Sequence, residues 1–228
     1  MAAVEDTALV MRTKPYRETS AMVNLFSMRH GRITAVRKGI RRGKGGTPLE
    51  PFSHIKISLI GRSGLKTLTQ FELIKRYQLA NKGLAAGFYI YELLTRGLLE
   101  HQVEEQIFNR ALTTIEAINS GSITVPLRRF ERFFLEMLGY GIDFDQTQTG
   151  ALLEDSTMYE FQSEAGFVEV PSRGMTGELI KRIGREDYID TDVIKGARTL
   201  YQQALAQVIG EKPLVSRSLL NPLRTPTQ

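Results

Sequence analysis

The stretch of the chain richest in positive charge is GRITAVRKGIRRGKGG, residues 31–46, which contains no acid. From residue 37 to residue 46, four glycines accompany five cations, a composition too flexible and self-repelling to order itself without a counter-charge. Phosphate groups are the obvious counter-charge, so the stretch predicts nucleic-acid binding, with a solvated surface loop as the alternative. Its six cations are Arg32, Arg37, Lys38, Arg41, Arg42 and Lys44.

Cations outside this stretch are expected to extend the same surface. They are Arg12, Lys14, Arg17, Lys66 and Arg62. An aromatic side chain among them, Tyr16 or Phe52, could stack on a base, which is worth about 1–3 kcal/mol. Ordinary packing in a core or a turn is the alternative for both rings, and it is favoured for Phe52.

A second cationic group lies in PLRRFERFFLEML, residues 126–138. At helical spacing the buried stripe is predicted to be Leu127, Phe130, Phe134 and Leu138. The arginines of the segment project elsewhere: Arg128, Arg129 and Arg132. From the residues alone, the favoured interpretation is that they pair with Glu131, with Glu136 or with a neighbouring helix.

Motifs that would support catalysis or metal binding fail on inspection. The segment Gly39 to Gly45 lacks the spacing of a phosphate-binding P-loop and its Ser or Thr. The run DFDQTQTGALLE lacks the central ligand and the glycine of a calcium loop. The chain has no cysteine and only three histidines. We therefore expect no enzyme, no catalytic residue, no metal and no cofactor.

The charge is distributed unevenly along the chain. Residues 1–80 hold 15 Lys and Arg against five acids, and the rest of the chain holds 15 against 20, within a net charge of +5. A positive first third suggests contact with a polyanion, although a merely basic surface is the alternative. The amino terminus lacks the charge pattern of a signal peptide, and no apolar run approaches membrane-spanning length. A cytoplasmic location is expected.

Up to about residue 77 the pattern predicts strands. Ile55, Ile57 and Leu59 alternate with polar residues in HIKISLIG, and rougher runs cover residues 7–12, 21–28, 32–40 and 65–75. Five short strands with tight turns and one long connection favour a small barrel such as an OB fold, a frequent oligonucleotide scaffold. An SH3-like barrel or a small sandwich would show a similar pattern.

After residue 81 the apolar residues recur at helical spacing. One helix is expected over residues 85–101, with Phe88, Tyr91, Leu94 and Leu98 on its apolar face. A third helix is expected from Pro126. Between them a second helix is expected, with one face formed by Val103, Ile107, Ala111, Ile115 and Ile118. Further along we expect a hairpin about SEAG, a short helix in TGELIKRI, a longer one in DVIKGARTLYQQALAQVI, and a last helical turn near the carboxyl terminus. The fold class is α+β. The expected domains are residues 1–80, residues 81–145 joined by helices from 175–222, and a small region at 146–174.

Four segments together resemble the RecO family of bacterial DNA repair and recombination mediators, most nearly its gammaproteobacterial branch. They are TKPYRETSAMVNLFSMRHGRITAVRKGIRR, LEPFSHIKISLIGRSGLKTLTQFE, GFYIYELLTRGL and LRRFERFFLEMLGYGIDF. The resemblance implies an N-terminal OB domain, a helical bundle and a smaller C-terminal region. It also implies binding of single- and double-stranded DNA, annealing of complementary strands, and loading of the RecA recombinase with RecR onto strands coated by single-stranded DNA-binding protein.

The resemblance also assigns residues. The family's DNA-binding barrel face corresponds here to Arg32, Arg37, Lys38, Arg41 and Arg42. The family holds the C-terminal tail of the single-stranded DNA-binding protein on its helical domain, and the matching segment LRRFE carries Arg128 and Arg129, with Arg132 added on helical geometry alone.

One departure from the family concerns zinc. Many relatives carry a four-cysteine zinc site, but Gln146 and Thr149 stand here where its first pair would fall. Zinc is not expected, and this region must depend on an apolar core that includes Tyr159, Phe161, Phe167 and Val168.

These observations lead to the hypothesis of a recombination mediator that neutralises phosphates so that complementary strands can approach each other. Two alternatives remain open. One is a protein-interaction adaptor with incidental DNA binding, and the other is an RNA-binding OB protein, because charge and barrel do not select the sugar.

Overall fold

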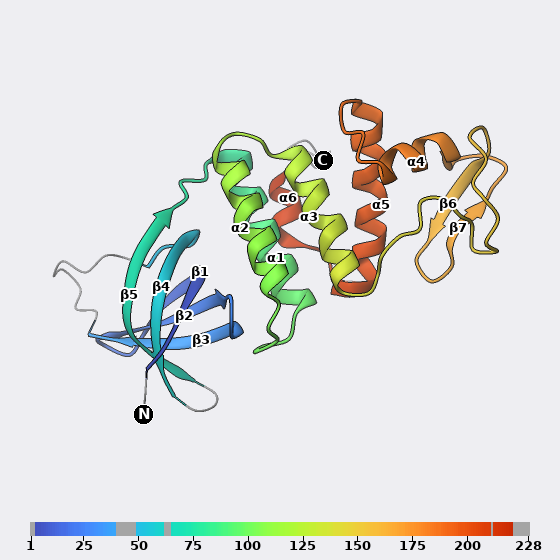
Figure 1. Cartoon of the computed structure of the whole chain (residues 1–228). Helices are drawn as coiled ribbons and strands as arrows, with labels where there is room; N and C mark the ends of the chain where they lie inside the picture. Colours follow the sequence, from blue (N-terminus) through green and yellow to red (C-terminus); the bar gives the residue numbers. More distant parts are fainter. Residues whose placement is uncertain (1–2, 40–48, 62–64, 211, 221–228) are drawn as a thin grey trace, which may run out of the picture. The chain divides into compact units, whose positions relative to one another are not determined.

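The computed structural model describes residues 3–39, 49–61, 65–210 and 212–220. Their contacts divide them into two compact units, one formed by the described residues of Met1–Gly121 and Leu214–Gln228, the other by Ser122–Pro213 (Figure 1). The expected domains group the residues differently, because the first two helices belong here with the barrel, whereas the third belongs with the C-terminal elements.

The first unit begins with a closed five-stranded barrel, as the sequence predicts. Its strands are ordered β1-β2-β3-β5-β4, and β1 closes the barrel by pairing with β4. Most pairs are antiparallel, while β3 and β5 pair in parallel through Ala35 with Lys66 and Val36 with Thr67. The strands are β1 (Val4–Tyr16), β2 (Ser20–Ser27), β3 (Gly31–Lys38), β4 (Ser53–Ile60) and β5 (Lys66–Arg76).

The barrel interior is filled by alternate residues of all five strands. Successive side chains of a strand point to opposite faces, so every second residue reaches the core. The buried cluster consists of Ala8, Val10, Val23, Leu25, Ile33, Ala35, Leu49, Ile55, Ile57, Leu59 and Leu68. This alternation leaves the outer face of β1, β2 and β3 available for other contacts.

Two helices and a short third one complete this unit: α1 (Asn81–Gly97), α2 (Glu105–Asn119) and α6 (Val215–Leu220). Helices α1 and α2 lie beside the barrel (Figure 1). Phe26 of β2 lies 5.7 Å from Phe108 of α2, between ring centroids. Gly87 of α1 allows the helix to approach closely, because a Cβ there would lie 2.7 Å from the Phe52 ring.

The helix faces differ in part from those predicted. In α1, Tyr89, Ile90, Leu93 and Leu94 are buried, whereas Phe88 is 37% exposed. Val103 is 53% exposed, because α2 begins only at Glu105 and Val103 precedes it. The helices exist where periodicity placed them, but Phe88 and Val103 do not join the core.

The second unit contains α3 (Thr124–Met137), α4 (Gly177–Gly184) and α5 (Thr191–Ile209) beside a three-stranded sheet of order β7-β6-β8. The sheet strands are β6 (Met158–Gln162), β7 (Gly166–Glu169) and β8 (Met175–Thr176). The hairpin about SEAG and the two predicted helices are confirmed. Side chains cap both helices: the Thr176 hydroxyl accepts from the Leu179 amide, and the Asp190 carboxylate accepts from the Asp192 amide.

Candidate nucleic-acid interface

The register of β1, β2 and β3 brings distant cations to one face of the barrel. Arg12 lies opposite Asn24, which lies opposite Thr34; Lys14 lies opposite Met22; and Lys38 lies opposite Ser20, which also pairs with Tyr16. Residues opposite each other in an antiparallel pair share a face, and so do residues two apart along one strand. Arg12, Lys14 and Lys38 therefore lie on the same outer surface, which we call the cationic face.

The cations of this face are exposed. Within the described part of the chain, the side chains of Arg12, Lys14 and Lys38 make no hydrogen bond or ion pair. Arg17 is also exposed, in the turn after β1, with its guanidinium carbon 5.2 Å from the centroid of the Tyr16 ring. Exposed cations that no internal acid neutralises are suited to phosphate groups.

Arg37 and Lys66 lie at the seam between β3 and β5. Arg37 has the opposite phase to Lys38, and its guanidinium carbon lies 4.3 Å from the centroid of the Phe71 ring. Burial lowers the pKa of Arg37. Lys66 is partly buried opposite Ala35. These two side chains lie on a different part of the barrel surface from Arg12 and Lys14.

Arg32 contacts the end of a helix. Its Nη1 donates to the backbone carbonyls of Thr95, at 2.7 Å, and of Leu98, both at the carboxyl end of α1. Burial lowers the pKa of Arg32, and the nearby Glu100 only partly offsets this effect. A cation at this position satisfies carbonyls that have no partner within the helix. Arg32 therefore fastens β3 to α1, a contact that the sequence reasoning did not foresee.

Three predicted cations of the basic stretch, Arg41, Arg42 and Lys44, lie outside the described residues, as does Arg62. Of the two candidate stacking rings, Phe52 is only 3% exposed and stacks on Tyr91, with ring centroids 4.7 Å apart. Phe52 is thus a core residue, in agreement with the packing role that was favoured for it over base stacking.

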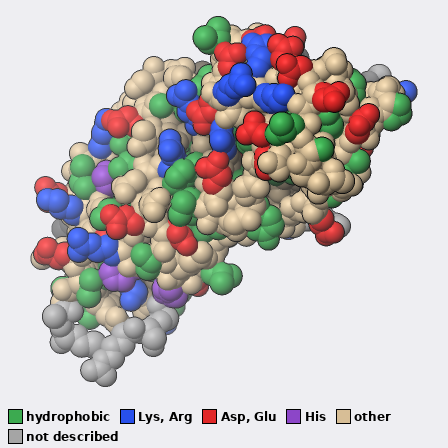
Figure 2. Space-filling model, turned by 45° about the vertical axis from the view of Figure 1, so that its right-hand side comes forward, with side chains coloured by type: hydrophobic (Ala, Val, Ile, Leu, Met, Phe, Trp, Pro, Cys, Tyr) green, Lys and Arg blue, Asp and Glu red, His purple; other side chains and the backbone are tan. Residues whose placement is uncertain are grey.

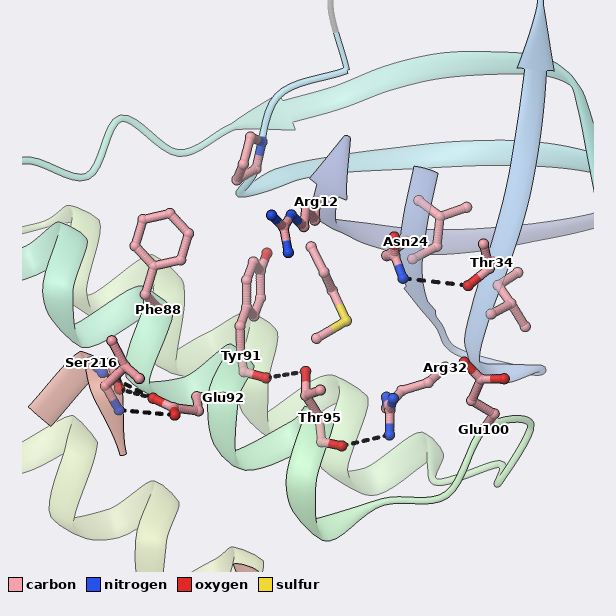
Figure 3. Close-up of a pocket in the computed structure, with 15 residues that line it drawn as sticks. Arg12, Asn24, Arg32, Thr34, Phe88, Tyr91, Glu92, Thr95, Glu100 and Ser216 are labelled. Atoms are coloured by element: carbon pink, nitrogen blue, oxygen red, sulfur yellow. Dashed lines mark hydrogen bonds between the residues drawn. The ribbon is translucent and has the colours of Figure 1, made fainter. Parts of the chain in front are cut away.

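A groove adjoins the cationic face within the same unit. It has a volume of about 630 Å³ and lies between the outer face of β1–β3 and the helices α1 and α6 (Figure 3). Arg12, Asn24 and Thr34 line it from the strands, and Phe88 and Tyr91 line it from α1. Of the residues that line the groove, only Arg12 and Arg32 were predicted to bind nucleic acid. The pairing of Arg12 with Asn24 and of Asn24 with Thr34 is the signal that places these two residues beside Arg12, but it depends on a strand register that the sequence does not show.

The arginines of α3 are engaged in the second unit. Arg128 is buried and donates from Nη2 to Glu131 at 2.8 Å, so it does not project as predicted. Arg129, with its side chain 52% exposed, donates to Glu186 at 2.9 Å. Arg132 donates to Glu136 at 2.8 Å and to the carbonyl of Gly184.

These contacts match the pairing that the residues alone favoured. Burial by itself would lower the pKa of Arg132, but its hydrogen bond with Glu136 and the nearby Glu186 raise it. Figure 2 shows Lys and Arg side chains intermixed with Asp and Glu over the visible surface, as such pairs require. Of the three arginines, Arg129 is the most accessible to a partner.

Hydrogen bonds hold the segment in which the resemblance placed the zinc cysteines. Asp143 accepts from the amides of Asp145 and Gln146, and the hydroxyls of Thr147 and Thr149 lie 2.9 Å apart. No group of three His, Cys, Asp or Glu suited to a metal occurs among the described residues. These side chains offer no thiolates and do not fit a structural zinc ion. In the expected apolar core, Tyr159 and Phe167 are buried, and Phe161 and Val168 are partly buried.

Comparison with known proteins supplies the family. Residues 1–77 match the family described as Recombination protein O N terminal, and residues 82–217 match Recombination protein O C terminal. The DNA repair protein RecO of Cellvibrio japonicus is 33% identical over 225 residues, which cover 94% of this chain and 95% of the relative. This chain belongs to the RecO family.

Other RecO proteins agree along the same length. RecO of Psychromonas ingrahamii is 34% identical over 93% of this chain, and RecO of Klebsiella pneumoniae strain 342 is 33% identical over 93% of it. RecO proteins are DNA repair proteins that mediate recombination and are not enzymes, so the predicted family and the prediction of a non-enzymatic protein are confirmed. In the part of the chain that the structure describes, no helix is long and apolar enough to cross a membrane.

Proposed function

We propose that this RecO protein binds single- and double-stranded DNA on the cationic face and anneals complementary strands. The observation that supports it most is the set of cations on neighbouring strands, Arg12, Lys14 and Lys38, whose side chains have no partner within the described residues. Their charges neutralise phosphates, which removes the repulsion between two strands, and base pairing then supplies the driving force. Further proposed contacts are Arg17, Arg41, Arg42 and Lys44, together with Arg37 and Lys66 on another part of the barrel surface.

The proposal includes the partners expected of a mediator. The protein helps to load RecA, together with RecR, onto strands coated by single-stranded DNA-binding protein, and it acts in the bacterial cytoplasm at the nucleoid. The tail of the single-stranded DNA-binding protein binds the second unit at the arginines of α3, with Arg129 as the accessible contact. A cation that already pairs with Glu186 can exchange one carboxylate for another, at little net cost in charge pairing.

A charge-removal experiment tests the DNA contact. In Lys14→Gln/Lys38→Gln, affinity for a single strand is expected to fall, and the slope of log affinity against log salt to become shallower by about 1.4, at about 0.7 per lost contact. Fluorescence anisotropy titrations over a salt series measure both. Lys56→Gln is the matched control, because Lys56 is exposed on β4 of the same barrel and pairs with Glu72.

Equal affinity and slope in the double variant and in the wild type would contradict a DNA contact at the cationic face. Annealing of complementary oligonucleotides, naked and coated by single-stranded DNA-binding protein, then separates a mediator from a protein that merely condenses strands. Competition between DNA and RNA of the same sequence shows whether the protein prefers DNA or RNA.

A further inference from the structure

The groove beside the cationic face presents an aromatic ring on a rigid support. Phe88 is 37% exposed and points from α1 into the space opposite the strands (Figure 3). Its ring packs edge-on against Phe52, with centroids 5.0 Å apart and planes at 64°, and Phe52 stacks on Tyr91. Phe52 and Tyr91 are buried, so Phe88 is held in position while much of its surface stays open. A fixed, accessible ring suits stacking with a planar ligand.

The strand side of the groove supplies polar groups. Asn24 donates from Nδ2 to the Thr34 hydroxyl at 3.3 Å, and both side chains line the groove beside Arg12 (Figure 3). An amide and a hydroxyl offer donors and acceptors that the edge of a nucleobase can use. The guanidinium of Arg12 is the positive charge that links the groove to the cationic face.

The charges of the groove indicate the kind of ligand. Glu92 and Glu100 also line it, together with Arg32. Burial by itself would raise the pKa of Glu92, but hydrogen bonds from Ser216 and Val215 of α6 and the nearby Arg96 lower it, so Glu92 stays ionised. An anionic ligand in the interior would meet these carboxylates. A ligand whose neutral part lies inside the groove and whose anionic group lies at Arg12 would avoid these carboxylates.

We propose that this groove holds one or two unstacked bases of a single strand whose phosphates lie on the cationic face. The inference depends on the proposed DNA binding and adds a subsite to it. A nucleotide has the required distribution of charge, with a neutral planar base for Phe88 and an anionic phosphate for Arg12. The volume of about 630 Å³ lies within the usual range of ligand sites, roughly 300–1,000 Å³. Paired bases of a duplex are not available to such a groove.

The experiment compares a thymidine oligonucleotide with a strand of equal length whose central bases are replaced by abasic sites. Anisotropy titrations use the full chain as wild type, Phe88→Ala and Phe88→Trp. The wild type is expected to bind the intact strand at least about fivefold more tightly than the abasic strand, from the strength of one stacked base. Phe88→Ala should lose this preference, and Phe88→Trp should keep it. All three proteins should bind a duplex equally.

Two controls keep the result interpretable. Unfolding in urea checks that Phe88→Ala is folded. The double variant Lys14→Gln/Lys38→Gln reports on the proposed function separately, through its salt slope.

The outcomes that overturn the groove proposal are distinct from those that overturn DNA binding. Equal wild-type affinity for intact and abasic strands, or a preference that survives in Phe88→Ala, contradicts base binding in the groove while leaving the cationic face intact. If Phe88→Ala binds both strands like the wild type but loses binding of an acidic peptide with a terminal phenylalanine, the groove is a peptide site and the nucleotide proposal is wrong. An unaltered salt slope in the lysine double variant would instead contradict the proposed function.

Discussion

Arg12 and Arg32 show how two arginines on one surface acquire different roles. Both line the groove, and both were predicted to bind nucleic acid. Arg32 reaches the carbonyls of Thr95 and Leu98, whereas the Arg12 side chain has no hydrogen-bond or ion-pair partner among the described residues. The residue type is the same, and the difference comes from the end of α1, which lies beside one of them only.

This contrast gives a paired prediction. Arg32→Gln is expected to lower the free energy of unfolding by about 1–2 kcal/mol, because charge-assisted hydrogen bonds to the α1 carbonyls are lost. Arg12→Gln should change it by less than about 0.5 kcal/mol, as for an exposed residue without contacts. Urea unfolding measures both. Salt-dependent DNA binding should show the reverse order, with the shallower slope in Arg12→Gln, and a stable Arg32→Gln would contradict the structural role.

Asp6 has a similar structural role at the start of the barrel. Its side chain is only 1% exposed, and it accepts hydrogen bonds from the Ser27 hydroxyl, His30 and the amides of Thr7 and Arg29. Burial alone would raise the pKa of Asp6, but these hydrogen bonds together lower it. The carboxylate form therefore stabilises the folded state.

The direction of this shift fixes a pH dependence. Because the folded pKa is depressed, the stabilisation is fully present above the ordinary value of about 3.9 and is lost as pH falls through the folded pKa. Asp6→Asn should lower the free energy of unfolding by about 1–3 kcal/mol at pH 7, and the gap to the wild type should narrow below about pH 4. Urea unfolding across pH measures the gap. A constant gap down to pH 2 would be inconsistent with this assignment.

At the scale of elements, helix α3 buries an ion pair beside its apolar residues. Leu127, Phe130 and Phe134 are buried, and so are Arg128 and Glu131 between them. Within the described residues, Nε and Nη1 of Arg128 have no hydrogen-bond partner. Such a pair costs desolvation that its attraction only partly offsets.

The ion pair predicts unequal effects of single and double substitution. Arg128→Met should destabilise the protein by about 3 kcal/mol, because the Glu131 carboxylate loses this cation. Arg128→Met/Glu131→Leu should recover most of the loss, because neither charge then remains buried. Denaturant unfolding of the three proteins measures the effect. A double variant as unstable as the single one would show that the pair contributes to stability in its own right.

At the scale of the whole molecule, the proposed activities belong to different units. The cationic face and the groove lie in the unit of the barrel, α1, α2 and α6, and the arginines of α3 lie in the unit Ser122–Pro213. The uneven charge along the chain agrees with this division, since the excess of cations falls in residues 1–80.

A separation of activities follows. Arg129→Ala should weaken binding of the acidic tail peptide several-fold, as expected for the loss of one exposed charge contact, and leave annealing of naked strands unchanged. Lys14→Gln/Lys38→Gln should reduce annealing of naked and coated strands alike. Peptide titration and annealing assays measure the two effects. Equal loss of tail binding and naked-strand annealing in Arg129→Ala would contradict separate sites.

Much of the fold is determined by local pattern, and the sequence alone predicted it. Alternation in HIKISLIG and helical spacing in LRRFERFFLEML both follow from backbone geometry, so five strands, the hairpin and the main helices could be located. The sequence also excluded a thiolate zinc site, because the chain has no cysteine to supply the thiolates.

Only the tertiary structure decided which charges remain available. Arg32 meets carbonyls more than 60 residues away in the chain, Arg128 is buried beside Glu131, and Arg12 lies in register with Asn24 and Thr34. Phe88 was expected in the core because helical spacing places it on an apolar face. Spacing does not show how far the surface that packs against that face extends, and Phe88 stays partly exposed. Local spacing indicated the pairs of Arg128 and Arg132 within α3. Partners that are distant in the chain are brought by its topology, and no local pattern carries that information.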